Sequence, residues 1–202
     1  MKATFKILII LTSILCSCGH SDNIPKTIVL QDTIDSKPTS KLEMQIAETL
    51  TLLQESDLKS MGQDQHEFRF YYFPSFESCK FFKLNYKDSS LTVKEFTNKK
   101  PDGSGEDKVL NSKSIKFTIK DFETLSDLVD KSMFWSLDRD MLKLSIDGSL
   151  YIYESKQFVS RKMSGIRKDY HIVLCNAPHN SDFINLGQFF LFKSGHKNIY
   201  KN

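Results

Sequence analysis

Alternation of apolar and polar positions predicts most of the strands in this chain. In residues 80–87 every second side chain is apolar or aromatic and those between are mostly polar, which is typical of a strand with one buried face. Residues 68–73 are apolar at nearly every position, as in a strand covered on both sides, and a proline follows them. Shorter patterns predict further strands at residues 91–96, 115–120, 142–146, 150–152, 157–164 and 169–176.

Apolar residues at helical spacing predict three helices. The first covers about 41–58 and opens with a capping-box motif. The second covers about 121–133 and carries a stripe of leucine, valine and phenylalanine. The third covers about 181–193 and stops at Gly195. Strands with turn-length links and helices at the ends of runs predict an α+β fold, with an antiparallel sheet of several hairpin-linked strands and about three helices.

Several segments resemble a group of uncharacterised exported bacterial proteins. The shared features are an aromatic first strand, a Phe-Trp pair after a helix, a hairpin of the form Asp-Gly-Ser-x-aromatic and a closing helix. The resemblance implies the boundaries of the fold and supplies no catalytic residue. The segments are Phe68–Phe73, Phe134-Trp135-Ser136-Leu137, Ile146-Asp147-Gly148-Ser149 with Tyr151 and Glu154, and Tyr170–Leu191.

The start of the chain has the pattern of a secretory signal. Two lysines precede a short apolar run, which falls well below the roughly 20 residues of a membrane-spanning helix. Leu15-Cys16-Ser17-Cys18 then resembles the bacterial lipobox, in which a leucine stands three residues before the acylated cysteine and a small residue stands directly before it. The resemblance implies that residues 1–17 are removed and that Cys18 carries a lipid anchor. The expected location is the cell envelope, at the outer membrane.

Cys16, Cys18 and His20 raise the alternative of a metal site. Zinc sites usually combine two ligands in one segment with two more elsewhere in the chain. Cys16 would be lost with the signal, and His20 falls in a segment with the composition of a tether. The lipid-anchor interpretation is therefore favoured.

Composition after the signal is that of one ordinary domain on a tether. Of 202 residues, removal of 17 leaves 185, which suffices for a single hydrophobic core. We expect a tether at 18–39, a single domain at 40–196 and a tail at 197–202. Loss of Lys2 and Lys6 lowers the formal net charge from +3 to +1, which argues against nucleic-acid binding. No cofactor motif is present in the sequence.

Cys79 and Cys175 remain in the expected domain. An even pair in an exported protein suggests a disulfide, and the alternative is two separate buried thiols. Each cysteine falls on an expected strand. Pairing therefore requires those two strands to be neighbours.

Other combinations of reactive residues are better explained by structure than by catalysis. Cys175 and His179 are close in sequence, but Pro178 turns the chain between them, so a nucleophilic pair is not expected. Asp147 and Glu154 flank the tip of the Asp-Gly hairpin, where we expect a turn residue and a solvated strand residue rather than paired carboxylates. The glycines at 103 and 105 lack the Gly-Lys-Ser/Thr ending of a phosphate loop. The histidines, which are scattered without metal-ligand spacing, are His66, His171 and His179.

Aromatic residues exceed what one sheet face needs, with 16 Phe and 7 Tyr in the chain. Both faces of the sheet could be covered, or one could meet a partner, and a shared core is the favoured explanation. The sequence therefore favours a lipid-anchored envelope protein whose domain binds a protein or small ligand without catalysis. The alternative is an exported hydrolase with an unrecognised site.

Overall fold

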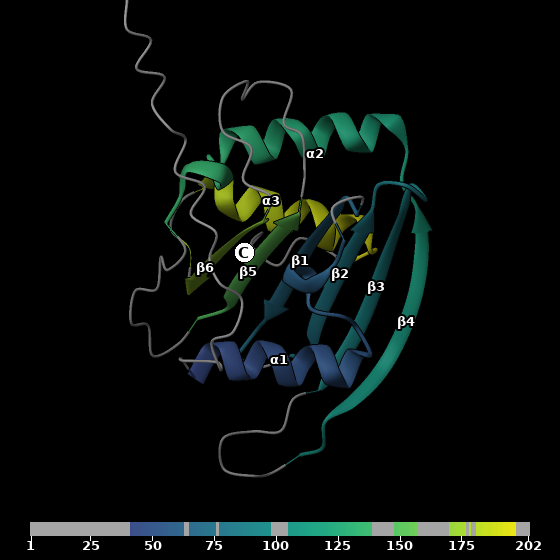
Figure 1. The fold of residues 1–202 in the computed structure, drawn as a ribbon, viewed down its shortest axis with the longest axis vertical. Helices are drawn as coiled ribbons and strands as arrows, with labels where there is room; N and C mark the ends of the chain where they lie inside the picture. Colours follow the sequence, from purple (N-terminus) through teal and green to yellow (C-terminus); the bar gives the residue numbers. More distant parts are fainter. Residues whose placement is uncertain are drawn as a thin grey trace, which may run out of the picture. The chain divides into compact units, whose positions relative to one another are not determined.

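Six strands form one antiparallel sheet, in a computed structural model that describes residues 41–62, 65–75, 77–97, 105–138, 148–156, 170–176, 178 and 181–196 (Figure 1). Three α-helices and two short 3-10 helices accompany the sheet in these ranges, so the predicted α+β fold is confirmed. The elements in chain order are α1 (Lys41–Leu53), η1 (Leu58–Ser60), β1 (Glu67–Phe73), β2 (Cys79–Asn85), β3 (Ser90–Thr97), β4 (Lys108–Lys116), α2 (Ile119–Lys131), η2 (Phe134–Ser136), β5 (Leu150–Lys156), β6 (Tyr170–Asn176) and α3 (Ser181–Lys193).

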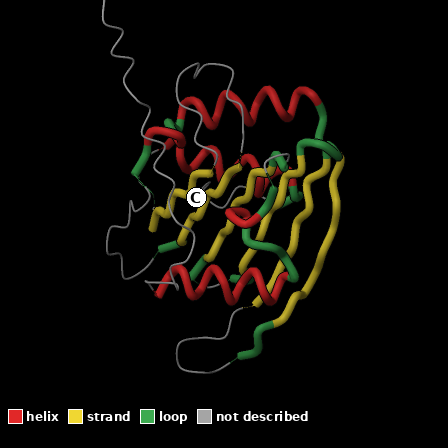
Figure 2. Tube along the Cα trace, viewed as in Figure 1, coloured by secondary structure: helices red, strands yellow, loops and turns green. Residues whose placement is uncertain are grey.

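The sheet has the order β4-β3-β2-β1-β5-β6, so its first strand in sequence lies at its centre (Figure 2). β1 pairs with β2 on one side and with β5 on the other. All seven residues of β1 are buried, which explains why its sequence shows no simple alternation of apolar and polar positions. The expectation that both faces are covered is confirmed.

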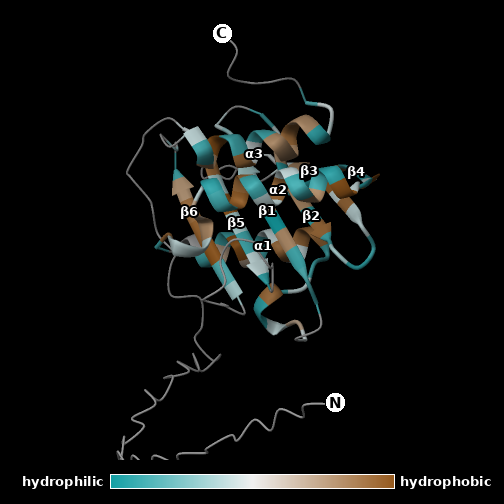
Figure 3. Cartoon of the chain, turned by 90° about the horizontal axis from the view of Figure 1, so that it is seen from above, coloured by the Kyte–Doolittle hydropathy of each residue, from teal (hydrophilic) through white to brown (hydrophobic). Residues whose placement is uncertain are grey.

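Helices cover the two faces of the sheet unequally (Figure 3). α1 lies on one side, which we call the α1 face, and α2 and α3 lie on the other, which we call the α2–α3 face. Phe68, Phe70 and Tyr72 of β1 pack into the core of the α2–α3 face. Tyr71 and Phe73 pack into a second core beneath α1. The surplus of aromatic residues is therefore used by two cores.

The predicted strand at 115–120 is wrong in its second half. Thr118 caps helix α2: its side chain accepts a hydrogen bond from the Asp121 amide, and the Asp121 carboxylate accepts one from the Thr118 amide. Ile119, which continues the apolar alternation, is the first helical residue and is 78% exposed. The strand itself begins earlier than expected, at Lys108. A capping box thus overrides a short period-two pattern.

Helix α1 ends before the predicted residue 58. Gln54 adopts a left-handed backbone conformation, with φ of 56°, and the Glu55 amide donates to the Leu50 carbonyl at 2.9 Å. The chain then crosses to the short helix η1, which Asp57 caps through the Lys59 amide at 3.0 Å. We call residues 54–62 the crossing segment. Helix α3, in contrast, has the bounds predicted from the sequence.

Several sequence predictions fall outside the described residues. They are the signal at 1–17, the lipid attachment at Cys18, the tether at 18–39, the tail at 197–202, the strands at 142–146 and 157–164, and the roles of Asp147 and His179. Among the helices that the structure describes, none has the length and apolar character needed to cross a bilayer.

Candidate functional site

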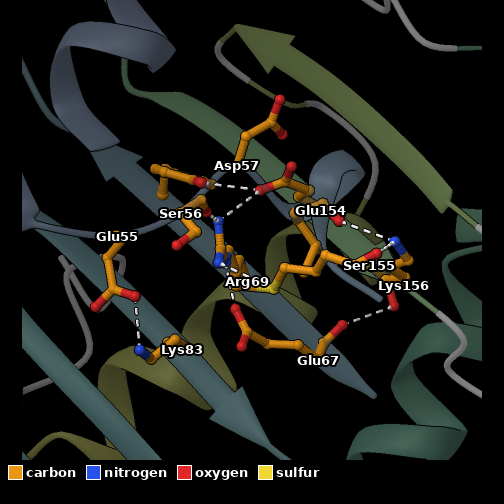
Figure 4. Close-up of polar contacts among 12 residues, drawn as sticks. Glu55, Ser56, Asp57, Glu67, Arg69, Lys83, Glu154, Ser155 and Lys156 are labelled. Carbon is orange, nitrogen blue, oxygen red and sulfur yellow. Dashed lines mark hydrogen bonds and ion pairs between the residues drawn. The ribbon is translucent and has the colours of Figure 1, made fainter. Parts of the chain in front are cut away.

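A group of charged and phenolic side chains is buried at one end of the α1 face (Figure 4). Glu67, Arg69 and Tyr71 alternate along β1 and therefore point to one face, and Glu154 of β5 lies opposite Arg69. Arg69 is 0% exposed and Glu154 is 2% exposed. The predicted role of Glu154 as a solvated strand residue is therefore wrong, because α1 and the crossing segment cover this face. We define the ionic cluster as Glu67, Arg69, Tyr71, Glu154, Lys156 and Tyr170.

Arg69 is the central cation of the ionic cluster. Its Nε donates to the Glu67 carboxylate, its Nη1 donates to the Ser56 carbonyl at 2.8 Å, and Nη1 lies 3.7 Å from Glu154 Oε2. Burial disfavours the charge, but the neighbouring Tyr71 and the two carboxylates outweigh it and raise the pKa of Arg69. The guanidinium is therefore a permanent positive charge inside the fold.

Both oxygens of Glu154 accept hydrogen bonds from tyrosines. Tyr71 donates to Oε2 and Tyr170 donates to Oε1, each at 2.9 Å. Burial raises the pKa of Glu154 above its usual value, although Arg69 and the two phenols favour the charged form. Burial, followed by the nearby Glu154 charge, also raises the pKa of Tyr71 and that of Tyr170. The two phenols therefore remain protonated donors at neutral pH.

Lys156 joins the ionic cluster to the crossing segment. Its Nζ donates to the carbonyls of Leu58 at 3.3 Å, Lys59 at 3.2 Å and Met61. The Leu58 carbonyl also accepts from the Met61 amide at 3.4 Å, and Lys156 adds a charged donor to this turn. Arg69 does the same for Ser56, so two buried cations hold the backbone of the crossing segment against the sheet.

A second ionic group lies beside the first. Glu55 accepts from Lys83 Nζ through Oε2 at 2.6 Å and from Lys94 Nζ through Oε1 at 2.5 Å. Burial favours the neutral carboxyl, but hydrogen bonds from the two lysines prevail and lower the pKa of Glu55. Lys94 also donates to the carbonyl of Leu53, the last residue of α1, where a cation suits the helix dipole.

The ionic cluster is organised to fix structure. A general base must lie within reach of a substrate proton. Both Glu154 oxygens instead accept hydrogen bonds from tyrosines of the same chain, and the carboxylate is enclosed. Strong pKa shifts mark functional sites, but buried ion-pair networks produce the same shifts. The contacts of Glu154 favour a buried ion-pair network over a functional site.

The two cysteines of the domain do not lie together. Cys79 belongs to β2 and packs in the core beneath α1, whereas Cys175 belongs to β6 and packs in the core of the α2–α3 face. Strands β1 and β5 lie between them, so their strands are not neighbours. At about 4.8 Å per strand spacing, and with side chains on opposite faces, the bridging distance of a disulfide is exceeded. The condition for a disulfide between Cys79 and Cys175 is thus not met, and the alternative of two separate buried residues describes their placement.

The remaining sequence candidates are not brought together in the described residues. His66 is exposed, whereas His171 is buried against the Phe134-Trp135 pair, with its Nε2 2.8 Å from the Phe134 carbonyl. The His171 ring stacks on Trp135 at a centroid distance of 5.7 Å. Within the ranges that the structure describes, no three His, Cys, Asp or Glu side chains are grouped as metal ligands would be.

Comparison with known proteins adds no assignment. No protein-family model matches the chain, and no curated protein shows significant similarity to it.

Sequence reasoning missed the ionic cluster. The signal that could have revealed it is Glu-x-Arg-x-Tyr in residues 67–71, a strand otherwise expected to be covered on both sides. A charged pair on one face of such a strand needs buried partners. Those partners come from residues 56 and 154, and sequence spacing does not show that the fold brings them together.

Proposed function

We propose that this chain is a lipid-anchored protein of the bacterial cell envelope, attached at the outer membrane through Cys18, whose α+β domain binds another molecule without catalysis. The observation that carries the anchor is the lipobox-like Leu15-Cys16-Ser17-Cys18 after a short apolar run. One acyl chain gives marginal membrane binding, so stable attachment calls for more than one.

The binding role is supported by how the domain uses its polar groups. The buried carboxylate that resembles a catalytic group accepts hydrogen bonds from two tyrosines and lies beside an arginine of the same chain. Strand β4, in contrast, exposes eight of its nine side chains. The buried charges pair within the chain, and β4 is exposed to solvent. This combination suits a domain that binds a partner at its surface.

The anchor is tested by two matched cysteine variants. Ser17 supplies the small residue that must precede the acylated cysteine, whereas bulky Leu15 precedes Cys16. Cys18→Ala should therefore abolish lipidation and shift the protein out of the detergent phase, while Cys16→Ala should leave both properties unchanged. Intact-mass measurement and detergent partition of both variants provide the readout. A Cys18→Ala protein that still carries lipid would contradict the proposal.

The non-catalytic role is tested separately with the detergent-solubilised protein. A panel of ester, phosphate, peptide and glycoside substrates should show no turnover above that of heat-denatured protein. Turnover that one point variant abolishes without unfolding the domain would favour the exported-hydrolase alternative.

A further inference from the structure

Strand β4 differs from every other strand of the sheet in its exposure. It forms one edge of the sheet, and among the described residues β3 is its only strand partner (Figure 2). All of its side chains are exposed except that of Ile115, which is half-buried, whereas six of the seven residues of β5 are buried. A long exposed edge presents backbone N–H and C=O groups that another strand can pair with.

A bulge divides β4 into two parts. Asn111 lies opposite Glu95 and Val109 lies opposite Phe96, so Leu110 is the extra residue, and its side chain is 50% exposed. The pairing with β3 is regular from Asn111 to Lys116. This six-residue part is the stretch at which an added strand finds an uninterrupted edge.

The charge of β4 is entirely positive. Lys108, Lys113 and Lys116 are its only ionisable residues, while Glu106 and Asp107 precede its bulged end. Lys113 donates to the Ser194 carbonyl at 2.6 Å, which holds its ammonium on the α2–α3 face. Lys116 belongs to the opposite face, because it lies three positions after Lys113. The regular part of the edge therefore has a cation on each face of the sheet.

This charge pattern distinguishes between two occupants of the edge. When two copies pair antiparallel along the regular part, about a two-fold axis at Lys113, the two Lys113 side chains lie directly opposite each other. Like charges directly opposite each other destabilise a strand pair. A strand with carboxylates on both faces instead meets Lys113 and Lys116 with the complementary sign. The lysines that disfavour a second copy thus favour an acidic partner.

We infer that β4 binds an extended acidic segment of another protein, which adds to the sheet along Asn111–Lys116. Main-chain hydrogen bonds to the edge supply affinity, and carboxylates facing Lys113 and Lys116 supply selectivity. An aliphatic side chain of the segment contacts the half-buried Ile115. This inference rests on the proposed binding role and names its surface and the chemistry of its partner.

The experiment uses the detergent-solubilised protein and an acetylated, amidated nine-residue peptide of repeated Glu-Glu-Val-Val, which places carboxylates and aliphatic side chains on both faces of a strand. Fluorescence polarisation of the labelled peptide measures affinity, and amide hydrogen exchange locates the pairing. Binding should slow exchange in residues 111–116, and affinity should fall with added salt. A peptide with Lys in place of Glu should bind at least about tenfold more weakly.

Two matched changes separate strand addition from simple charge attraction. A peptide of the same sequence that is N-methylated at every internal amide keeps its charge but loses its main-chain donors, so its affinity should fall at least about tenfold. Lys113→Glu with Lys116→Glu should weaken binding to a similar extent. Lys120→Glu with Lys131→Glu, an equal charge change at exposed sites on α2, should alter affinity less than about threefold.

Three outcomes would overturn the inference. They are no binding of the acidic peptide at millimolar concentration, equal binding of the N-methylated peptide, and protection at β6 instead of β4. A fourth overturning outcome is concentration-dependent dimerisation that protects β4, which would assign the edge to a second copy. None of these results affects the cysteine test of the anchor or the turnover test, so failure of this inference is distinguishable from failure of the proposed function.

Discussion

The two faces of strand β1 are equally buried but depend on different chemistry. Phe68, Phe70 and Tyr72 point into a core of stacked and tilted rings, whereas Glu67 and Arg69 point into the ionic cluster. On the first face, removing atoms loses contact area. On the second face, removing one group leaves others buried and charged. The comparison shows that burial by itself does not reveal how a position stabilises the fold.

The aromatic side depends on close fit. Phe70 stacks with Tyr153 at a centroid distance of 4.7 Å and an interplanar angle of 12°. Helix α3 approaches these rings at Gly187, where a Cβ atom would lie 2.6 Å from Tyr153 Oη and 2.7 Å from Tyr151 Cε1. Tyr153 Oη also donates to the Phe183 carbonyl at 2.9 Å, which fixes the ring. Helix and sheet meet here with no room for a methyl group.

The ionic side depends on balance of charge. Paired charges taken out of water gain little over an apolar replacement of the same shape, but a lone buried charge is costly. Arg69 contacts Glu67, Glu154 and the Ser56 carbonyl. Loss of Arg69 would therefore remove contacts in β1, in β5 and in the crossing segment at the same time.

The largest expected effect is that of Arg69→Met. The variant keeps side-chain length but leaves Glu67 and Glu154 without their cation, so the free energy of unfolding should fall by about 3–5 kcal/mol. Adding Glu67→Gln and Glu154→Gln to the same chain should recover a large part of the loss, because neither carboxylate is then buried without its arginine. Denaturation in urea measures both variants. If the triple variant is less stable than Arg69→Met alone, charge balance does not explain this face.

A smaller effect is expected at Gly187 on the aromatic side. Gly187→Ala should lower the free energy of unfolding by about 1–3 kcal/mol, because its methyl group would overlap Tyr153 and Tyr151. Gly62→Ala is the matched control, since no atom lies within 4 Å of the added carbon. Tyr153→Phe should cost less in the Gly187→Ala background than in the native chain, which thermal unfolding of the four proteins would measure. Equal losses for Gly187→Ala and Gly62→Ala would contradict the close-fit explanation.

The smallest expected effect is a pair of opposite pH slopes on the ionic side. The pKa of Glu154 is raised on folding, so its contribution to stability is complete below the unfolded-state value and is lost as pH rises through the folded-state pKa. The pKa of Glu55 is lowered, so its contribution is present above the unfolded-state value and is lost as pH falls through the folded-state pKa.

The free energy of unfolding of Glu154→Gln should therefore increase relative to that of the native chain as pH rises. The free energy of unfolding of Glu55→Gln should increase relative to that of the native chain as pH falls. The pKa values of Tyr71 and Tyr170 are raised on folding, as that of Glu154 is, so these phenols also make stability fall with rising pH. The free energy of unfolding of the native chain should therefore fall above about pH 10. Urea unfolding at a series of pH values provides the test. If the stability difference from the native chain changes with pH in the same direction for both variants, the two carboxylates do not differ in environment.

Local sequence patterns determined the elements whose environment is simple. Helix α3 has the expected bounds because its apolar spacing and Gly195, at φ of 84°, both mark the same end. β2 and β3 were predicted because turn residues separate two alternating runs. The class of fold follows from such elements, because hairpin-linked strands pair antiparallel.

Only the tertiary structure decided how these elements are combined. Period-two alternation shows which side chains share a face, but it does not show which strands become neighbours or whether a polar face is covered. Cys79 and Cys175 were separated by the strand order, and Glu154 was buried by the crossing segment, which lies nearly 100 residues earlier in the chain. A carboxylate on a strand is solvated or buried according to what packs over it, and that depends on long-range contacts that no local pattern encodes.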